Sequence, residues 1–378
     1  MRKGWEYKKL GEVCALTMGQ SPDGNSINEV NGIEFHQGKT CFGERFLGIS
    51  PLYSNAPTKL AEAHSVLLCV RAPVGYPNIT DRKICIGRGL CALYAKREID
   101  NSFLYYSLLG KQSYFEKNAT GSTFKAISSK IVSNTTLSIP PLSTQLAIVS
   151  ELDKINELIR LKKEQLKDFD NLAQSLFYEM FGDPVENEKG WDVKKLKDIS
   201  REIGDGLHGT PEYSEVDTGC YFINGNNLEN GTIVIKENTK MVSEKTKAKH
   251  YIEMDDFTIL VSINGTLGKV AFYNGENVIL GKSACYIKLE AYNDKKYIFE
   301  LLKSDYFKRY AESECTGTTI RNVSLKSMRN FRCPLPPLPL QRLFAQRIEQ
   351  IEREKSEVQK SIQDLETLLA SRMQYWFE

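Results

Sequence analysis

The most regular pattern of apolar and polar positions follows two Pro-Pro pairs. In the later segment apolar residues recur every three or four positions, at Phe344, Ile348, Ile351, Val358, Ile362, Leu365, Leu369 and Trp376, with polar interruptions at Lys355 and Arg372. The same pattern lies 196 residues upstream, at Ile148, Leu152, Ile155, Ile159, Leu166, Phe169, Ala173, Leu176 and Met180, with one interruption at Lys162. A seam sustained over five heptads is typical of a coiled coil.

An alternative is a helical hairpin packed on a domain core, but the outward faces of both segments are heavily charged. Each Pro-Pro pair stands just before its helix, where proline stops a strand without breaking the coil. We expect the second helix to run antiparallel to the first, as a spacer of about 55 Å. A polar residue in the seam, Lys162 or Lys355, would fix the register.

The repeat extends beyond these helices. "GWEYKKLGEV" at Gly4 matches "GWDVKKLKDI" at Gly190, and "ATGSTFKAISSK" at Ala119 matches "CTGTTIRNVSLK" at Cys315. Between these anchors the two halves share little, which suggests two domains of one fold with different surfaces. We predict domains at 1–144 and 182–340, each followed by a spacer helix, at 145–181 and 341–378.

Each domain is predicted to be α/β (α+β). "SVLLCVRAPVG" and "FTILVSINGTLG" are short apolar runs stopped by Gly or Pro, which favours strands. "YFINGNNLENGTIVI" indicates strand, turn and strand. "NSFLYYSLLGKQSYFEKNA" and "KKYIFELLKSDYFKRYAES" each indicate one amphipathic helix. Two such domains with an antiparallel spacer would make a dumbbell with approximate two-fold symmetry.

Charge and cysteines narrow the class of protein. The net charge is +2, but residues 1–144 carry 17 Lys/Arg against 11 Asp/Glu, so this segment alone is clearly basic. Nine cysteines without a C-x-x-C pair favour reduced thiols in a cytoplasmic protein over a zinc site or disulfides. The chain has no run of about 18 apolar residues and no apolar signal segment at its start.

A spacer between two related domains suggests recognition of two places at a fixed separation, and successive major grooves of DNA lie about 34–36 Å apart. Amide and basic side chains in loops can contact bases, Asn or Gln to adenine and Arg or Lys to guanine. Turn-forming or solvated roles are the competing interpretation for each one. The candidates are His36, Gln37, Lys39, Arg45, Arg71, Lys125, His208, Asn224, Asn226, Asn227, Lys245, Lys249 and Arg321.

The chain resembles the specificity (S) subunits of Type I restriction–modification enzymes over essentially its whole length. The resemblance rests on the paired "TGSTFKAIS" and "TGTTIRNVS" segments, the paired "PPLSTQ" and "PPLPLQ" helix starts, "GWDVKKLKDI" after "FGDP", and "DGLHGTPEY". It implies two target recognition domains that each recognise half of a split DNA sequence, and helices that set the gap and dock two methyltransferase subunits. It also implies a motor-nuclease subunit in the complex, no catalysis by this chain, and S-adenosylmethionine, Mg and ATP only on partners.

No catalytic set competes with this interpretation. "IPPL" and "LPPL" lack the polar and aromatic residues of an adenine methyltransferase loop, and "GTLGKV" lacks the spacing of a P-loop. The recognition part of a Type IIB-like enzyme and a protein-binding dumbbell remain alternatives.

Overall fold

The computed structural model describes residues 4–121, 125–316 and 321–377. The chain forms two compact units, Met1–Lys163 with Lys360–Glu378 (unit 1) and Glu164–Gln359 (unit 2). Both boundaries fall inside the two longest helices, α5 (Leu142–Phe181) and α10 (Leu338–Phe377), so each helix contributes one part to each unit.

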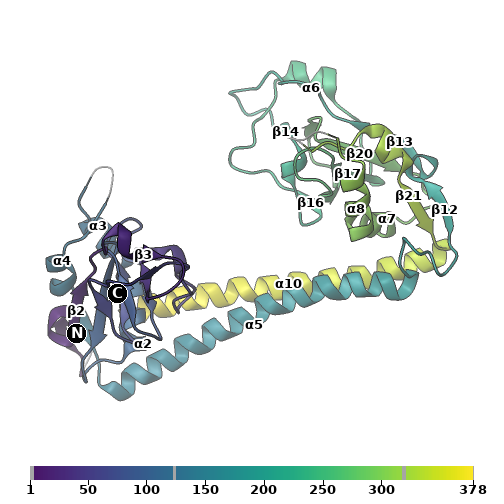
Figure 1. Cartoon of the computed structure of the whole chain (residues 1–378). Coiled ribbons are helices and arrows are strands. Elements are labelled where there is room, and N and C mark those ends of the chain that lie inside the picture. The colour runs from purple at the N-terminus through teal and green to yellow at the C-terminus, as the bar shows by residue number, and fades with distance from the viewer. Residues whose placement is uncertain (1–3, 122–124, 317–320, 378) are drawn as a thin grey trace. The chain divides into compact units, whose positions relative to one another are not determined.

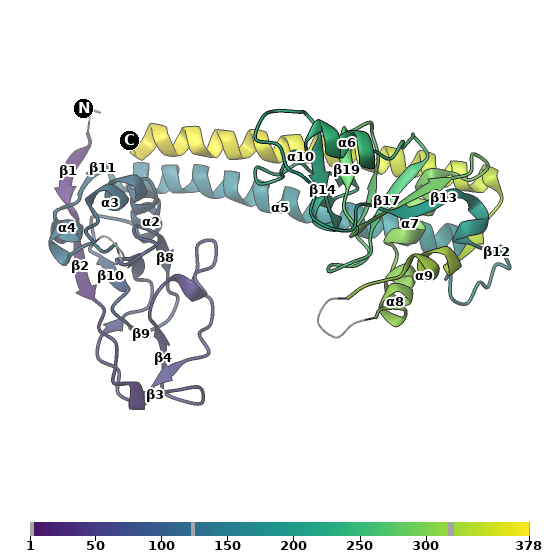
Figure 2. The same cartoon turned by 90° about the horizontal axis from the view of Figure 1, so that it is seen from above.

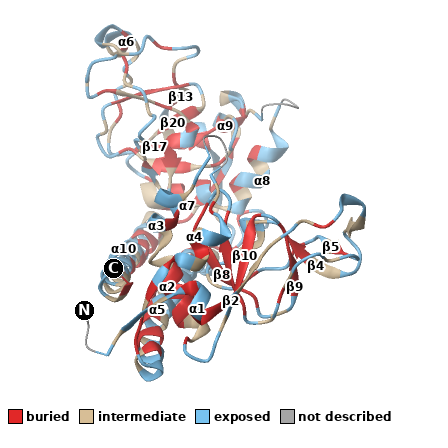
Figure 3. Cartoon of the chain, turned by 90° about the vertical axis from the view of Figure 1, so that its left-hand side faces the viewer, coloured by how far each residue is buried: buried red, intermediate tan, exposed pale blue. Residues whose placement is uncertain are grey.

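Unit 1 is organised around an antiparallel sheet in the order β2-β10-β7-β8, with a second sheet, β3-β5-β4-β9-β6, and the pair β1-β11. Strands β8 and β10 are largely buried (Figure 3). The strands are β1 (Glu6–Lys9), β2 (Cys14–Met18), β3 (Ile27–Asn28), β4 (Ile33–His36), β5 (Tyr53–Ser54), β6 (Leu60–Ala61), β7 (Val66–Cys69), β8 (Pro77–Ile79), β9 (Ile84–Ile86), β10 (Leu90–Ala95) and β11 (Thr136–Ile139). The short helices are α1 (Leu10–Val13), α2 (Asn101–Leu109), α3 (Gln112–Asn118) and α4 (Ser129–Asn134).

Unit 2 repeats this plan with the antiparallel sheet β13-β20-β17-β18 and the pair β12-β21. A parallel pair, β14-β19, and a hairpin, β15-β16, complete it. The strands are β12 (Asp192–Lys195), β13 (Ser200–Asp205), β14 (Tyr221–Ile223), β15 (Leu228–Glu229), β16 (Thr232–Ile233), β17 (Thr258–Ser262), β18 (Val270–Phe272), β19 (Val278–Leu280), β20 (Ala284–Leu289) and β21 (Arg332–Leu335). The short helices are α6 (Glu244–His250), α7 (Lys295–Lys303), α8 (Asp305–Ser313) and α9 (Leu325–Asn330). The predicted α/β fold class in two tandem copies is therefore confirmed.

The repeated glutamine has the same structural role in both units. Gln145 is fully buried, and its Nε2 donates to Pro140 O and Glu98 O, each at 2.9 Å. Its Oε1 accepts from Asp100 N at 2.9 Å, and Asp100 caps α2. In unit 2, Gln341 Nε2 donates to Pro336 O at 2.8 Å and Oε1 accepts from Asp294 N at 2.9 Å, where Asp294 caps α7. The glutamine thus joins the long helix to the first turn of the helix that packs on it.

The long helices pair within each unit, where they lie side by side (Figures 1 and 2). In unit 2, Phe177 and Phe181 of α5 pack against Phe344 of α10, with ring centroids 5.8 and 5.1 Å away. In unit 1, Leu152 of α5 belongs to the same core as Phe377 at the end of α10. The pairing is antiparallel because the late part of each helix meets the early part of the other. Both helices begin three residues before the predicted start, at Leu142 and Leu338.

Two local predictions were wrong. Each segment expected to form one amphipathic helix forms two, α2 and α3 in unit 1 and α7 and α8 in unit 2. The first break is at Gly110, where a Cβ would lie 2.7 Å from Phe377 Cβ, so the helix end packs against α10. The second is at Ser304, which ends α7 and begins α8. "YFINGNNLENGTIVI" forms three strands, because β14 pairs with β19 and only β15 and β16 form the hairpin.

All nine cysteines are free, and seven are buried. Burial raises the pKa of the Cys14, Cys69 and Cys91 thiols to about 12. Cys41 in unit 1 and Cys315 in unit 2 are partly exposed.

Candidate nucleic-acid interface

Four polar side chains surround a small hollow of about 130 Å³ on unit 1. Gln37 and Lys39 follow β4, Arg71 follows β7, and Arg88 lies between β9 and β10. All four residues are exposed, and we call them the basic hollow. The fold thus brings together three predicted candidates from turns that are far apart in the sequence, and adds Arg88.

Backbone hydrogen bonds hold these turns together. Gly89 N donates to Gln37 O at 3.1 Å, and a Cβ on Gly89 would lie only 2.2 Å from that oxygen, so a side chain there would push the turns apart. Ala72 N donates to Lys125 O at 3.0 Å, which places the exposed Lys125 beside the basic hollow. Lys39 Nζ lies 3.6 Å from the centroid of the Tyr76 ring, a cation–π contact that orients it.

His36 was a wrong candidate, because it is 2% exposed and belongs to a buried network. Its Nε2 lies 2.9 Å from Glu34 Oε1, and Glu34 also accepts from Arg82 Nε and Ser50 N, each at 2.6 Å. Burial lowers the pKa of His36 despite Glu34, so the ring is neutral near pH 7. Burial alone would raise the pKa of Glu34, but the hydrogen bonds from Arg82, Ser50 and His36 lower it to about 2. The network fixes β4, which leads directly into Gln37.

Arg45, another candidate, is partly buried and engaged inside unit 1. Its Nη1 lies 2.5 Å from Asp153 Oδ1 on α5, and its guanidinium carbon lies 5.3 Å from the ring centroid of Tyr106 and 5.5 Å from that of Tyr105. Tyr106 OH donates to the same Asp153 oxygen at 2.6 Å. Arg45 therefore anchors its loop to the spacer helix.

Unit 2 presents different side chains at the corresponding positions. Gly281 N donates to Ile223 O as Gly87 N donates to His36 O, and the bridge between Asn264 and Asn322 matches that between Arg71 and Ala126. Gly265 N donates to Arg321 O at 3.0 Å, as Ala72 N does to Lys125 O. In place of Gln37, Lys39, Arg71, Arg88 and Lys125, unit 2 thus has the set that we call the amide set: Asn224, Asn226, Asn264, Lys282 and Arg321.

The predicted asparagines divide by exposure. Asn226 is exposed, whereas Asn227 is 5% exposed and was a wrong candidate. Asn227 Oδ1 accepts from Asn224 N at 3.0 Å and its Nδ2 donates to Val234 O at 3.0 Å, so it holds the turn closed. Asn224 Oδ1 accepts from Ser283 Oγ at 2.9 Å. Its oxygen is therefore already engaged, and Asn226 and Asn264 are the better candidates for base contacts.

The remaining candidates of unit 2 lie at its surface. His208 is exposed with its Nε2 2.7 Å from Asp205 Oδ2, and its turn meets the amide set because Lys282 N donates to Leu207 O at 3.1 Å. Arg321 is exposed, with Nη1 3.7 Å from Glu312 Oε1. Lys245 and Lys249 are exposed on α6. Two other lysines of this region have contacts within unit 2: Lys236 pairs with Glu229 at 2.7 Å, and Lys240 lies over Tyr213.

Sequence reasoning missed Arg88, Asn264 and Lys282. Arg88 and Lys282 stand at the same place in "CIGRGLCALYA" and "ILGKSACYIKL", the segments in which the two halves still match. The sequence therefore did contain a signal for these two residues: both copies of the repeat have a basic residue between two strands. Asn264 follows β17 as Arg71 follows β7. Each of these strands leads into a Gly-containing turn in the sequence, and this shared pattern could have indicated Asn264 as the counterpart of Arg71.

The predicted seam residues mostly point inward. Ile148, Leu152, Ile155, Ile159, Ile348, Ile351, Val358 and Ile362 are buried, and Leu166, Phe169, Leu365 and Leu369 are partly buried. The polar interruptions pair across the helices: Lys355 Nζ lies 2.9 Å from Asp170 Oδ1, and Arg372 Nη2 donates to Glu151 Oε2 at 3.0 Å. The chain itself therefore covers most of the seam.

In the described parts of the chain, no helix combines the length and apolar character needed to cross a membrane. In the same residues, no three His, Cys, Asp or Glu side chains gather as a metal site would require.

Two copies of one α/β fold, each with a polar cluster built from the same turns, define a protein with two related recognition surfaces. The family model described as Type I restriction modification DNA specificity domain matches residues 2–168 and 188–367, so the chain belongs to this family and contains its domain twice.

Relatives agree with this assignment. The putative type I restriction enzyme MjaX specificity subunit of Methanocaldococcus jannaschii is 36% identical over 176 residues, which cover 46% of this chain and 41% of that protein. The type I restriction enzyme MjaVIII specificity subunit of the same organism is 21% identical, with 97% of this chain and 92% of that protein covered. A crystal structure of the Type I restriction–modification S subunit from M. genitalium shares the fold, with a TM-score of 0.52, 16% identity, and 99% and 96% of the two chains covered.

Proposed function

We propose that the chain recognises the two halves of a split double-stranded DNA sequence, one half with each unit, and catalyses no reaction itself. The observation that carries the proposal is the pair of clusters at matching positions. One frame of turns holds the basic hollow in unit 1 and the amide set in unit 2. Two related domains that recognise different DNA sequences require the same backbone turns with different side chains on them.

The side chains suggest which bases each unit contacts. Arginine and lysine pair with guanine O6 and N7, whereas asparagine pairs with adenine N6 and N7. We therefore assign guanine contacts in the first half-site to Arg71 and Arg88, and adenine contacts in the second to Asn226 and Asn264. Lys125, Arg321, Lys245 and Lys249 suit phosphate contacts, which position the protein without reading bases.

The partners in this proposal follow from the family. Double-stranded DNA lies against the two clusters, two methyltransferase subunits bind outward faces of the spacer helices, and restriction motor-nuclease subunits join through them. The methyltransferase subunits carry S-adenosylmethionine, the motor-nuclease uses ATP and Mg, and this chain holds no cofactor. The complex would act in the cytoplasm.

The test is to coexpress the chain with its methyltransferase subunit and to map methylated adenines across a genome. The expected result is a split motif with a fixed gap. Arg71→Ala should relax one base position in one half-site, by about 1–3 kcal/mol or roughly 5–150-fold, and leave the other half unchanged. Asn264→Ala should do the same in the other half. Arg97→Ala, an exposed arginine outside the basic hollow, is the control. Relaxation of both half-sites by one variant would contradict independent recognition.

A further inference from the structure

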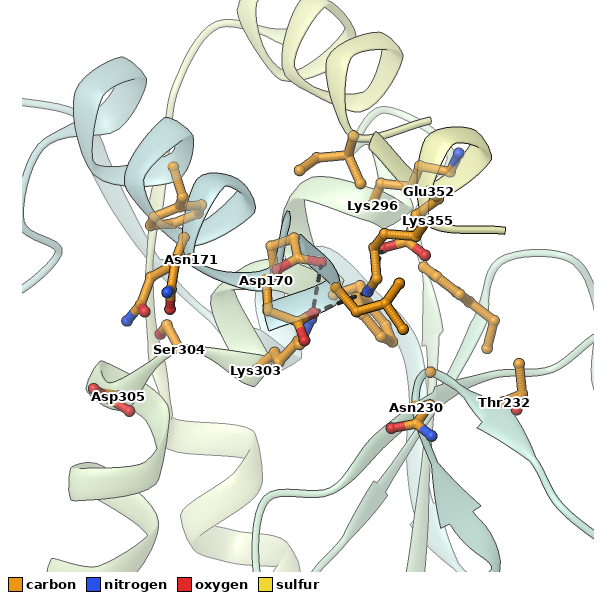
Figure 4. Close-up of a pocket in the computed structure, with 18 of the residues that line it drawn as sticks. Asp170, Asn171, Asn230, Thr232, Lys296, Lys303, Ser304, Asp305, Glu352 and Lys355 are labelled. Carbon is orange, nitrogen blue, oxygen red and sulfur yellow. Dashed lines mark hydrogen bonds and ion pairs between the residues drawn. The ribbon is translucent and has the colours of Figure 1, made fainter. Parts of the chain in front are cut away.

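Unit 2 contains a cavity of about 870 Å³ that the DNA proposal leaves without a function. Its walls are α5, α7, the start of α8, α10 and the turn between β15 and β16. Figure 4 shows Asp170 and Lys355 on the long helices and Asn230 and Thr232 on the hairpin. A cavity of this size accommodates several side chains of a bound segment.

Glu300 of α7 lines this cavity as a buried carboxylate with a weak partner. Its side chain is 11% exposed, and its ion pair with Lys303 spans 3.9 Å, beyond hydrogen-bond distance. Two other acids of the lining are closely paired: Asp170 with Lys355 at 2.9 Å and Asp305 with Lys308 at 3.1 Å. Burial raises the pKa of Glu300. A buried carboxylate of this kind gains from a cation that can hydrogen-bond to it.

In unit 1, an arginine side chain occupies the place that corresponds to this cavity. Ile79 N donates to Arg45 O at 2.9 Å, and Phe272 N donates to Gly231 O at 2.9 Å, so Gly231 of unit 2 stands where unit 1 has Arg45. In unit 1 the Arg45 guanidinium enters between the sheet edge and α5, close to Tyr105 and Tyr106. Unit 2 has no side chain at Gly231, and this glycine lines the cavity.

Unit 2 has other groups at the positions that receive Arg45 in unit 1. Counting from the matching caps Asp100 and Asp294, Tyr105 and Tyr106 correspond to Phe299 and Glu300, both of which line the cavity. Counting from Gln145 and Gln341, Asp153 corresponds to Glu349, which pairs with Lys296 at 2.6 Å. Aromatic rings beside a buried carboxylate suit a planar guanidinium better than a compact ammonium.

From these contacts we infer that the cavity binds an arginine side chain of a partner protein, with its guanidinium on Glu300 and against Phe299. The inference rests on the proposed docking of protein subunits and names the contact chemistry of one docking site. DNA recognition by the basic hollow and the amide set does not depend on it.

The direct test uses the full chain and a small probe. Titration with Nα-acetyl-arginine amide, followed by calorimetry or ligand-observed NMR, should show saturable binding, and the uncharged isostere Nα-acetyl-citrulline amide should bind at least tenfold more weakly. Glu300→Gln should weaken arginine binding at least tenfold. This variant should fold well, because a neutral amide is easier to bury than a carboxylate. Glu237→Gln, at an exposed acid of unit 2, should have no effect.

A second variant fills the cavity of unit 2 with an arginine from the chain itself, as Arg45 does at the matching place in unit 1. Thr232→Arg, next to Gly231 at the cavity wall, supplies a guanidinium from the chain itself and should block the probe. Equal binding of citrulline and arginine amides, or unchanged binding by Glu300→Gln, would overturn the inference.

A third experiment tests the partner protein, and it measures the affinity of the chain for the coexpressed methyltransferase subunit. Glu300→Gln and Thr232→Arg should each lower it at least tenfold, whereas an unchanged affinity would refute the partner assignment. Failure of the proposed function would appear differently, as a wild-type complex that methylates no split motif.

Discussion

The buried Glu34 network should make the stability of unit 1 depend on acid pH in a predictable way. Glu34 is 11% exposed on its side chain and is bonded to Arg82, Ser50 N and His36. Its pKa is lowered from 4.5 to about 2 in the folded chain. At 1.36 kcal/mol per pKa unit, the ionised carboxylate contributes about 3 kcal/mol to the free energy of unfolding.

The sign follows from the direction of the shift. A lowered folded-state pKa stabilises the fold above the pKa of the unfolded chain, near 4.3, and this stability is lost as pH falls toward 2. Glu34→Gln should therefore cost about 3 kcal/mol at pH 7 and progressively less below pH 4. The lowered pKa of His36 acts in the same direction, because the neutral ring favours the fold above about pH 6.5 and this contribution is lost on acidification.

The assay is urea unfolding followed by tryptophan fluorescence in a Trp191→Phe background. The chain has three tryptophans, and Trp5 and Trp376, with stacked rings 6.2 Å apart, both belong to unit 1. Glu62→Gln is the matched control, because Glu62 forms an exposed ion pair with Lys83, and such pairs contribute little. Equal losses in the two variants, or a Glu34→Gln deficit that does not shrink below pH 4, would refute the reasoning.

Three further predictions concern the helices. Gln145→Ala and Gln341→Ala should each lower stability by about 1–3 kcal/mol, seen as a lower melting temperature, because buried backbone groups lose their partners; an unchanged melting temperature would exclude a joining role. Four residues inserted within Leu158–Leu166 should change the gap in the methylated motif, and an unchanged gap would rule out the spacer role. Lys355→Met should change stability little, since Asp170 remains hydrated, but a large loss in thermal unfolding would show that this pair holds the seam.

The sequence predicted the larger architecture because repeats and heptads are periodic signals. The long helices, their antiparallel pairing and the two α/β copies all follow from such periodicity. The breaks at Gly110 and Ser304 did not, and the one at Gly110 depends on the close approach of Phe377 of α10. Gln145 was recognised as part of a repeated corner, but the three hydrogen bonds of its buried side chain could only be seen once the cap of α2 was placed beside it.

The candidate site was predicted less completely, because residue type indicates chemistry but not exposure. Gln37, Lys39 and Arg71 do gather, whereas His36 is buried beside the equally buried Phe35 and contacts Glu34. Asn227 has the same amide as Asn226 and serves only its own turn. Arg45 finds its partner 108 residues away on α5, a distance at which no local pattern gives information.

The distribution of thiols gives this protein a pair of natural labelling sites. Among the nine cysteines only Cys41 and Cys315 are partly exposed, and one lies in each unit. A maleimide dye would therefore react first at these two positions without any substitution. Energy transfer between two dyes would then report the separation of the units in solution, with and without DNA. Since Cys41 ends the turn that begins with Lys39, the brightness of its dye would report occupation of the basic hollow in the same experiment.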